Sequence, residues 1–206
     1  MEIYFIRHGE TNGNVARRHQ AEHSPLTFKG EEEVRKAALL IKALKPTHLM
    51  TSSLVRALDT AKVIGKECDL VPDTFSYLNE LKRPDKLYGN YHFSIGSFIF
   101  YFKWFLGREG KESTDGESYA DLLKRIEIVK EKVASLPPDA KLVIVSHSVF
   151  INFFVAHMCQ TKKLNVFQAT KTFFNLLTMP NTQIKAVTYN PETNSGQCAW
   201  SVNLQN

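Results

Sequence analysis

The sequence lacks three features that mark large classes of proteins: a long apolar run, a regular cysteine pattern and a dense cluster of basic residues. No window of about 18 residues is apolar throughout, so we expect no membrane span. The chain opens with a short apolar stretch and has no basic head. This start is typical of a first strand and argues against a signal peptide.

Cysteine is scarce, and its spacing matches neither of its common structural uses. The three cysteines, Cys68, Cys159 and Cys198, are odd in number and far apart in the chain. We therefore expect neither a metal-binding pattern nor a disulfide framework. Proteins without disulfides are typical of a reducing cytosol, so the sequence predicts a cytoplasmic protein.

Basic residues exceed acidic ones, but they are not arranged as in a nucleic-acid-binding protein. The formal net charge is +5, and the clearest basic clusters are the pairs Arg17-Arg18 and Lys162-Lys163. A nucleic-acid surface would need dense basic residues interleaved with aromatic ones. The mild excess instead favours a small anionic ligand. We expect no nucleic acid as a partner.

The remaining composition is that of an ordinary globular protein, in which strand-like and helix-like segments alternate. Residues 2–6, 48–51 and 141–145 are predicted as short buried strands. The last of these segments is continuously apolar, which is typical of a central strand in a parallel sheet.

Helices are predicted between and after these strands. A helix of about 17 residues follows Thr27, and a long helix begins at Ser118. Ser53 is predicted as the N-cap of a further helix. The apolar run 149–159 and the segment 164–175 are also predicted as helices.

The chain ends in a predicted hairpin with strands 183–189 and 197–202 and a turn at 191–196. Strands that alternate with helices predict an α/β fold. We expect a three-layer sandwich with a mostly parallel central sheet, helices on both of its faces and a C-terminal hairpin. Residues 82–117 differ in composition from the rest of the chain: the segment is first loop-like, then rich in aromatic residues, then polar.

Four residues with basic side chains follow the predicted strands. Arg7-His8 ends the first strand, His147 follows the strand 141–145, and Arg56 lies one helical turn beyond the strand 48–51. The carboxyl ends of parallel strands are where open α/β sheets bind ligands. Guanidinium groups suit phosphate oxygens, and an imidazole among them can attack phosphorus. The arrangement therefore predicts phosphate chemistry.

Five motifs resemble the histidine phosphatase superfamily, the phosphoglycerate-mutase-like proteins. They are Arg7-His8-Gly9-Glu10-Thr11 with Asn14, Leu26-Thr27-Phe28-Lys29-Gly30, the segment 52–61, Leu78-Asn79-Glu80-Leu81 and Val145-Ser146-His147. The resemblance extends over nearly the whole chain and implies one phosphoglycerate-mutase-like domain, 1–206, with a variable cap insertion at about 82–117. It is specific for the family and weak for the substrate.

The resemblance also implies roles for six residues. His8 is the nucleophile that becomes phosphohistidine, and Glu80 is the acid for the leaving oxygen and then the base for water. The phosphoryl oxygens are held by Arg7, Asn14, Arg56 and His147. Because fixed cations supply the charge stabilisation, we expect no metal ion and no cofactor. The expected activity is a metal-independent phosphatase that hydrolyses small phosphomonoesters.

Two alternatives remain beside this hydrolase. One is a phosphoglycerate-type mutase, although the adjacent arginine pair that mutases carry in the insertion, and their Thr-Gly-Trp after the first loop, are missing here. The other is a protein that binds phosphoesters without turnover, although no catalytic residue is lost. A further departure is Ser148, where the family commonly has glycine after the second histidine.

The segment 93–106 holds seven aromatic residues. As a helix it would place Ile95, Phe98 and Phe102 on one apolar face and Phe100 and Trp104 on a second. Three interpretations stay open at this point: a cap helix packed into its own domain, a lid that favours a bulky or apolar leaving group, and a homodimer or membrane-surface contact.

Overall fold

A sheet of six strands organises the part of the chain that the computed structural model describes, residues 1–107, 115–193 and 197–203. Across the sheet the strands are β3 (Asp73–Thr74), β2 (His48–Thr51), β4 (Lys141–Ser146), β1 (Glu2–Arg7), β5 (Ile184–Tyr189) and β6 (Trp200–Val202). The first four are parallel, and β5 and β6 form an antiparallel hairpin beside β1. The predicted α/β fold is therefore confirmed. Residues 194–196 of the predicted turn lie outside the described residues.

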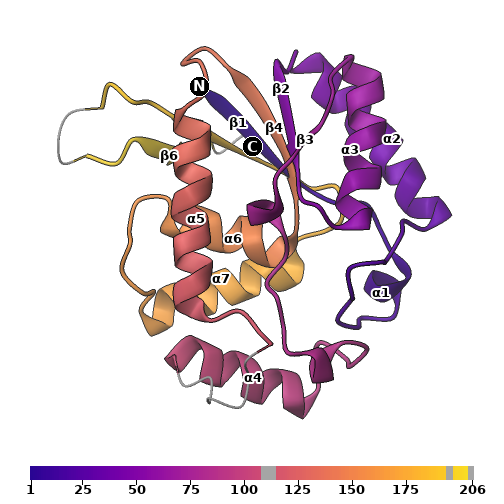
Figure 1. Cartoon of the computed structure of the whole chain (residues 1–206), viewed down its shortest axis with the longest axis vertical. Coiled ribbons are helices and arrows are strands. Elements are labelled where there is room, and N and C mark those ends of the chain that lie inside the picture. Colours follow the sequence, from indigo (N-terminus) through magenta and orange to yellow (C-terminus); the bar gives the residue numbers. More distant parts are fainter. Residues whose placement is uncertain (108–114, 194–196, 204–206) are drawn as a thin grey trace.

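Helices cover both faces of the sheet (Figure 1). One face carries α2 (Phe28–Ala43) and α3 (Val55–Cys68), and the other carries α5 (Tyr119–Ala134), α6 (Ser148–His157) and α7 (Val166–Thr178). Two further helices, α1 (Asn12–Val15) and α4 (Ile95–Leu106), lie beyond the end of the sheet toward which β1 runs (Figure 1). Short 3-10 turns span Ser76–Leu78 and Asp85–Leu87.

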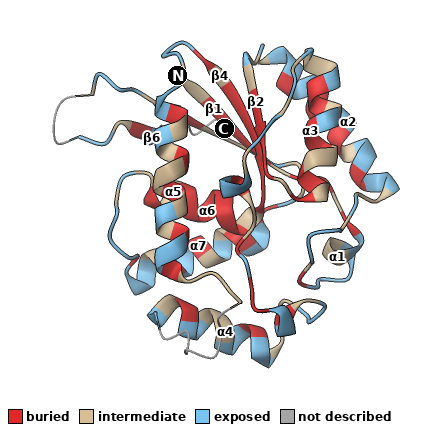
Figure 2. Cartoon of the chain, viewed as in Figure 1, coloured by how far each residue is buried: buried red, intermediate tan, exposed pale blue. Residues whose placement is uncertain are grey.

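Two hydrophobic cores lie on the two faces of the sheet because successive side chains of a strand point to opposite sides. From β1, Ile3 and Phe5 pack with α5, α6 and α7, whereas Tyr4 and Ile6 pack with α2 and α3. The strands and the inward faces of these helices are buried (Figure 2). This double burial explains why the central strands are apolar along their whole length.

Side-chain caps fix the starts of two of the predicted helices. The hydroxyl of Thr27 accepts a hydrogen bond from the Gly30 amide at 2.9 Å, and Ser118 forms a capping box at the start of α5. The predicted cap at Ser53 is wrong. Leu54 occupies the N-cap position of α3, because the Ser53 hydroxyl is bonded to the side chain of Asn79 instead.

The register of the parallel strands aligns their carboxyl ends. Arg7 of β1 lies opposite Ser146 of β4, and Thr51 of β2 lies opposite Val145. The loop after β1 passes so close to α2 that a Cβ atom on Gly30 would come within 2.2 Å of the Glu10 carbonyl oxygen. Only glycine permits this close approach, and it seats the residues that follow His8.

The expectation that the cysteines form no disulfide is wrong. Cys159, just after α6, is bonded to Cys198, just before β6, and Cys68 is the free cysteine. The spacing could not show this pairing, because 39 residues separate the two positions in the sequence. The argument from cysteine usage to a reducing cytosol therefore does not hold. None of the helices in the described part of the chain has the length and apolar character needed to cross a membrane.

We predict that the disulfide stabilises the oxidised protein by restricting its unfolded chain. Cys159→Ser and Cys198→Ser should each lower the free energy of unfolding by about 2–4 kcal/mol in urea titrations. Cys68→Ser is the matched control and should lower it much less. Equal values for all three variants in the absence of reductant would contradict the prediction.

Candidate active site

Two histidine rings meet where β1 and β4 end. The ring centroids of His8 and His147 are 5.1 Å apart, and the His8 amide donates to the Ser146 carbonyl at 3.0 Å. The parallel pairing of the two strands produces this contact between residues that are far apart in the sequence. The structure therefore brings His8 and His147 together, as their positions at the ends of two predicted strands indicated.

His8 is held in one tautomer. Its Nδ1 lies 2.7 Å from the Gly9 carbonyl oxygen, which can only accept, so Nδ1 carries the proton and Nε2 keeps its lone pair. The ring is buried, and burial lowers its pKa well below the usual value, with Arg56 and Arg7 adding to the effect. A neutral imidazole with a free Nε2 can act as a nucleophile.

His147 lies behind His8 and does not line the cavity described below. Its Nε2 is 2.7 Å from the Ser52 hydroxyl, and that hydroxyl lies 2.8 Å from the Asn79 side-chain oxygen. Its buried Nδ1 has no hydrogen-bond partner within the described ranges. Burial lowers the pKa of His147 well below the usual value, and the charge of Arg56 lowers it further.

Two guanidinium groups lie near the rings, that of Arg56 buried and that of Arg7 half-buried. Arg7 donates to the Met179 carbonyl and Arg56 to the Ala21 carbonyl, while the Nε of each is buried without a partner among the residues that the structure describes. Neither forms a salt bridge with a carboxylate in that part of the chain. Burial lowers the pKa of Arg56 to about 10, so the group remains charged at neutral pH. The pair can bind an anion with several oxygen atoms.

Asn14 is oriented by the loop after β1. Its side-chain oxygen accepts from the Thr11 amide at 3.1 Å and from the Asn181 amide group at 3.1 Å, so its own NH₂ is directed away from these donors. Asn181 also donates to the His8 carbonyl at 3.0 Å and lines the cavity. Sequence reasoning missed Asn181, because it lies beyond α7 and no motif contains it.

Backbone amides at the start of α6 hold the Glu80 carboxylate. It accepts hydrogen bonds from the amides of Val149 at 3.4 Å and Phe150 at 3.3 Å, and from that of Leu81 at 3.0 Å. These donors leave the carboxylate on the cavity wall with Arg7 and His8. Ser148, the departure from the family pattern, begins α6 and lines the same cavity.

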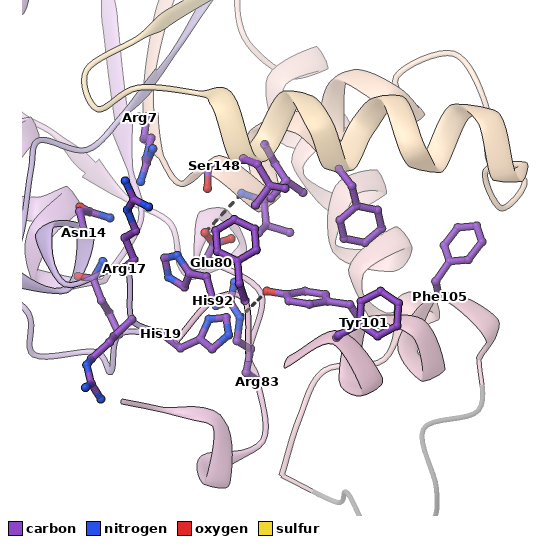
Figure 3. Close-up of a pocket in the computed structure, with 18 of the residues that line it drawn as sticks. Arg7, Asn14, Arg17, His19, Glu80, Arg83, His92, Tyr101, Phe105 and Ser148 are labelled. Carbon is purple, nitrogen blue, oxygen red and sulfur yellow. Dashed lines mark hydrogen bonds between the residues drawn. The ribbon is translucent and has the colours of Figure 1, made fainter. Parts of the chain in front are cut away.

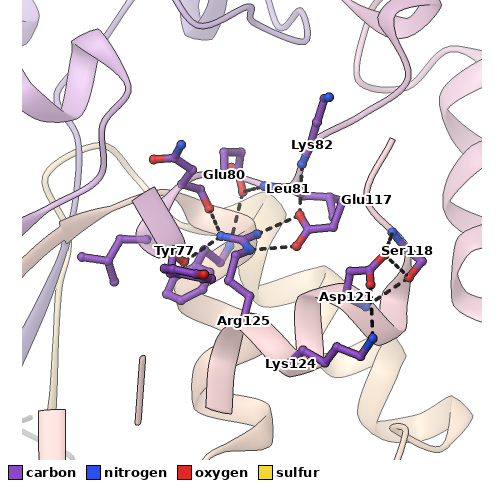
Figure 4. Close-up of polar contacts among 12 residues, drawn as sticks. Tyr77, Glu80, Leu81, Lys82, Glu117, Ser118, Asp121, Lys124 and Arg125 are labelled. Atoms are coloured by element: carbon purple, nitrogen blue, oxygen red, sulfur yellow. Dashed lines mark hydrogen bonds and ion pairs between the residues drawn. The ribbon is translucent and has the colours of Figure 1, made fainter. Parts of the chain in front are cut away.

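A buried ion pair fixes the backbone on both sides of Glu80 (Figure 4). Arg125 of α5 donates to the Asn79 carbonyl and pairs with Glu117 through N–O distances of 2.7 and 2.8 Å. Glu117 in turn accepts from the Lys82 amide at 3.2 Å. The sequence pattern gave no sign of this support, because the partners come from an irregular segment and a helix.

A cavity of about 960 Å³ opens beside His8 (Figure 3). Arg7, His8, Asn14, Arg56 and Glu80 line it, so five of the six predicted site residues share one cavity. Three arginines without a predicted role join them: Arg17, Arg18 and Arg83. The last is buried and donates its Nε–H to the Tyr101 hydroxyl at 2.8 Å.

The helix α4 forms a further wall of the cavity, and only part of its apolar surface is buried. Trp104 is fully buried and donates its Nε1–H to the Glu117 carbonyl at 3.0 Å. The first apolar face, with Ile95, Phe98 and Phe102, is exposed. Phe98 and Phe102 line the cavity.

Comparison with known sequences identifies proteins that are similar to this chain. The family model of the histidine phosphatase superfamily (branch 1) matches residues 3–195. The probable phosphoglycerate mutase GpmB of Enterobacter sp. (strain 638) is 30% identical over 166 residues, which cover 76% of this chain and 74% of that protein. The protein of the same name from Photorhabdus laumondii is 32% identical over 157 residues, covering 75% and 73%.

Solved structures show the same fold. A mycobacterial glucosyl-3-phosphoglycerate phosphatase in complex with VO3 superposes with a TM-score of 0.77 and 26% identity, covering 100% of this chain and 98% of that one. A putative alpha-ribazole-5'-P phosphatase from Escherichia coli has a TM-score of 0.76 and 20% identity, covering 98% and 95%. The second likeness shows the fold alone.

The lowered pKa of His8 predicts that its ring stays neutral in mildly acidic solution. A histidine of ordinary pKa would be about three-quarters protonated at pH 6. Because the pKa in the folded protein is lowered, the neutral form should persist at that pH, observed as ring ¹⁵N signals in NMR spectra assigned with His8→Ala. A midpoint near 6.5 for His8 would contradict the prediction.

Proposed function

The chain belongs to the histidine phosphatase superfamily, and from that membership we propose that it hydrolyses phosphomonoesters through a phosphohistidine on His8. One observation supports this activity more than any other. His8 is a buried, neutral imidazole whose Nδ1–H is fixed on the Gly9 carbonyl. It lies near the guanidiniums of Arg7 and Arg56, which pair with no carboxylate of the described residues. Such a site suits a nucleophile that attacks an anion.

In the first step, Nε2 of His8 attacks phosphorus and the bond to the leaving oxygen breaks. The imidazole becomes cationic as the N–P bond forms, and the Gly9 carbonyl stabilises the proton on Nδ1. Arg7 and Arg56 hold the phosphoryl oxygens, with Asn14 as a further donor. His147, which the resemblance also assigns to the phosphate, contacts the His8 ring and does not line the cavity. Glu80 supplies the proton that converts the leaving oxygen into an alcohol.

In the second step, water attacks the phosphohistidine. The Glu80 carboxylate takes a proton from the water as its oxygen bonds to phosphorus. The N–P bond then breaks, its electron pair returns to Nε2 of His8, and inorganic phosphate leaves. Guanidinium groups supply the charge stabilisation in both steps, so the proposed mechanism needs neither a metal ion nor a cofactor.

The proposed substrate is a small phosphorylated molecule. The proposed location of the protein is the cytoplasm. A phosphoglycerate-type mutase remains the alternative, because the sequence relatives carry that name. A mutase would return the phosphoryl group from His8 to the product, whereas a phosphatase loses it to water. Binding without turnover is disfavoured, because every residue that the two steps need is present.

We predict that phosphate is trapped on His8. Rapid quenching with ³²P-labelled phosphoester should give alkali-stable label on the wild-type protein and none on His8→Ala, which should also lose turnover. His48→Ala is the matched control and should keep both label and activity. EDTA should leave the rate unchanged. Full activity in His8→Ala, or chelator-sensitive activity that a divalent ion restores, would contradict the proposed function.

We predict that Arg125 acts by positioning Glu80. Arg125→Met should slow hydrolysis of an alkyl phosphate about tenfold or more, and should slow a nitrophenyl phosphate less because its leaving oxygen needs less protonation. Glu80→Gln should show the same dependence on leaving group with a larger loss, roughly 10²–10⁴-fold on the alkyl ester. Lys124→Met, the neighbouring exposed position, is the control. Equal losses on both substrates would show that Arg125 has only a structural role.

A further inference from the structure

The cavity beside His8 continues into an apolar groove between α4 and α7, and we propose that this groove holds the hydrocarbon chain of an amphiphilic phosphate monoester. The proposal rests on the proposed function and specifies its substrate class. Six side chains define the groove: Phe98, Phe102 and Leu106 from α4, and Val166, Phe173 and Leu177 from α7.

The two helices form opposite walls of one groove. Tyr101 of α4 and Phe173 of α7 meet edge to face, with ring centroids 5.7 Å apart. In Figure 3, Tyr101 and Phe105 lie on one side of Glu80, and Arg7 and Asn14 lie on the other. The phosphate site and the aromatic wall therefore belong to the same cavity and face one substrate.

The groove side chains are exposed to a degree that is unusual for large apolar residues. Phe98 is 72%, Phe102 is 58% and Leu177 is 53% exposed. A contiguous exposed apolar surface of this kind marks a binding site. Because it adjoins the guanidiniums of Arg7 and Arg56, its charge pattern complements a molecule that is anionic at one end and apolar at the other.

The groove offers little to a polar leaving group such as a sugar. The groove has two hydroxyls: that of Thr170 donates to the Val166 carbonyl at 2.9 Å, and that of Tyr101 accepts from the Arg83 Nε–H, which leaves one O–H donor. The other lining residues of the two helices are apolar. Hydrogen-bonding groups placed here beyond one acceptor would lose water without gaining partners, which is costly.

The size of the cavity agrees with a long substrate. Its volume of about 960 Å³ lies at the upper end of the range of about 300–1,000 Å³ that is usual for small-molecule sites. A phosphoester with two or three carbons would fill only the end near His8. A hydrocarbon chain that runs along α4 and α7 would bury the exposed aromatic rings.

The test compares butyl, octyl and dodecyl phosphate, each below its critical micelle concentration. For the wild-type enzyme, kcat/KM should rise with chain length, by up to about fourfold for each methylene that the groove buries. Phe102→Ser and Leu177→Ser, one from each wall, should reduce the ratio of kcat/KM for dodecyl to butyl phosphate at least tenfold. Both side chains are more than half exposed, so both variants should fold.

Two matched controls lie on the same helices and outside the groove. Ile99→Ser on α4 and Phe174→Ser on α7 remove exposed apolar side chains that do not line the cavity, and they should keep the dodecyl-to-butyl ratio of the wild type. The same reduction in all four variants would overturn the proposal, since a general loss of apolar surface would then explain it.

The remaining outcomes separate the proposal from its rivals. A ratio near one in the wild-type enzyme overturns the apolar groove while leaving the phosphatase activity in place. Absence of turnover on every ester overturns the proposed function itself. If groove variants change only the mass measured by light scattering, or only sedimentation with phosphatidylglycerol vesicles, a second copy or a membrane covers the groove and the proposal is wrong.

Discussion

Buried positive charge without a carboxylate partner is the constraint on which the site depends. Arg56 is buried and Arg7 is half-buried near His8, and no salt bridge in the described part of the chain neutralises either group. A desolvated guanidinium is costly unless an anion binds it, and the same charge keeps the neighbouring imidazoles neutral. One arrangement therefore supports both the proposed binding of phosphate and the proposed role of the neutral His8 ring as nucleophile.

Glu80 lies near these arginines and yet is held by other groups. Its carboxylate accepts hydrogen bonds from amides at the start of α6, and Arg125 with Glu117 fixes the backbone beside it. A carboxylate bound directly by Arg7 or Arg56 would neutralise the charge that the phosphate needs. The ion pair of Arg125 thus keeps the acid close to the cations and separate from them.

The cavity combines two parts of different origin. The ends of β1 and β4 and the start of α3 supply the charged end, which the sheet register and the tight contact at Gly30 hold in place. The apolar end comes from α4, which lies beyond the end of the sheet (Figure 1), and from exposed side chains of α7, which packs on one face of the sheet.

The sequence by itself determined five of the six strands, the main helices and the strand ends that carry Arg7, His8 and His147. These features are local, because periodicity, caps and strand-end motifs act over a few residues. Only the tertiary structure decided which face of α4 is buried, that Cys159 pairs with Cys198, and that Asn181 joins the site. Each of these depends on contacts between segments distant in the chain, and an apolar helix with two similar faces does not specify by its pattern which face meets the core.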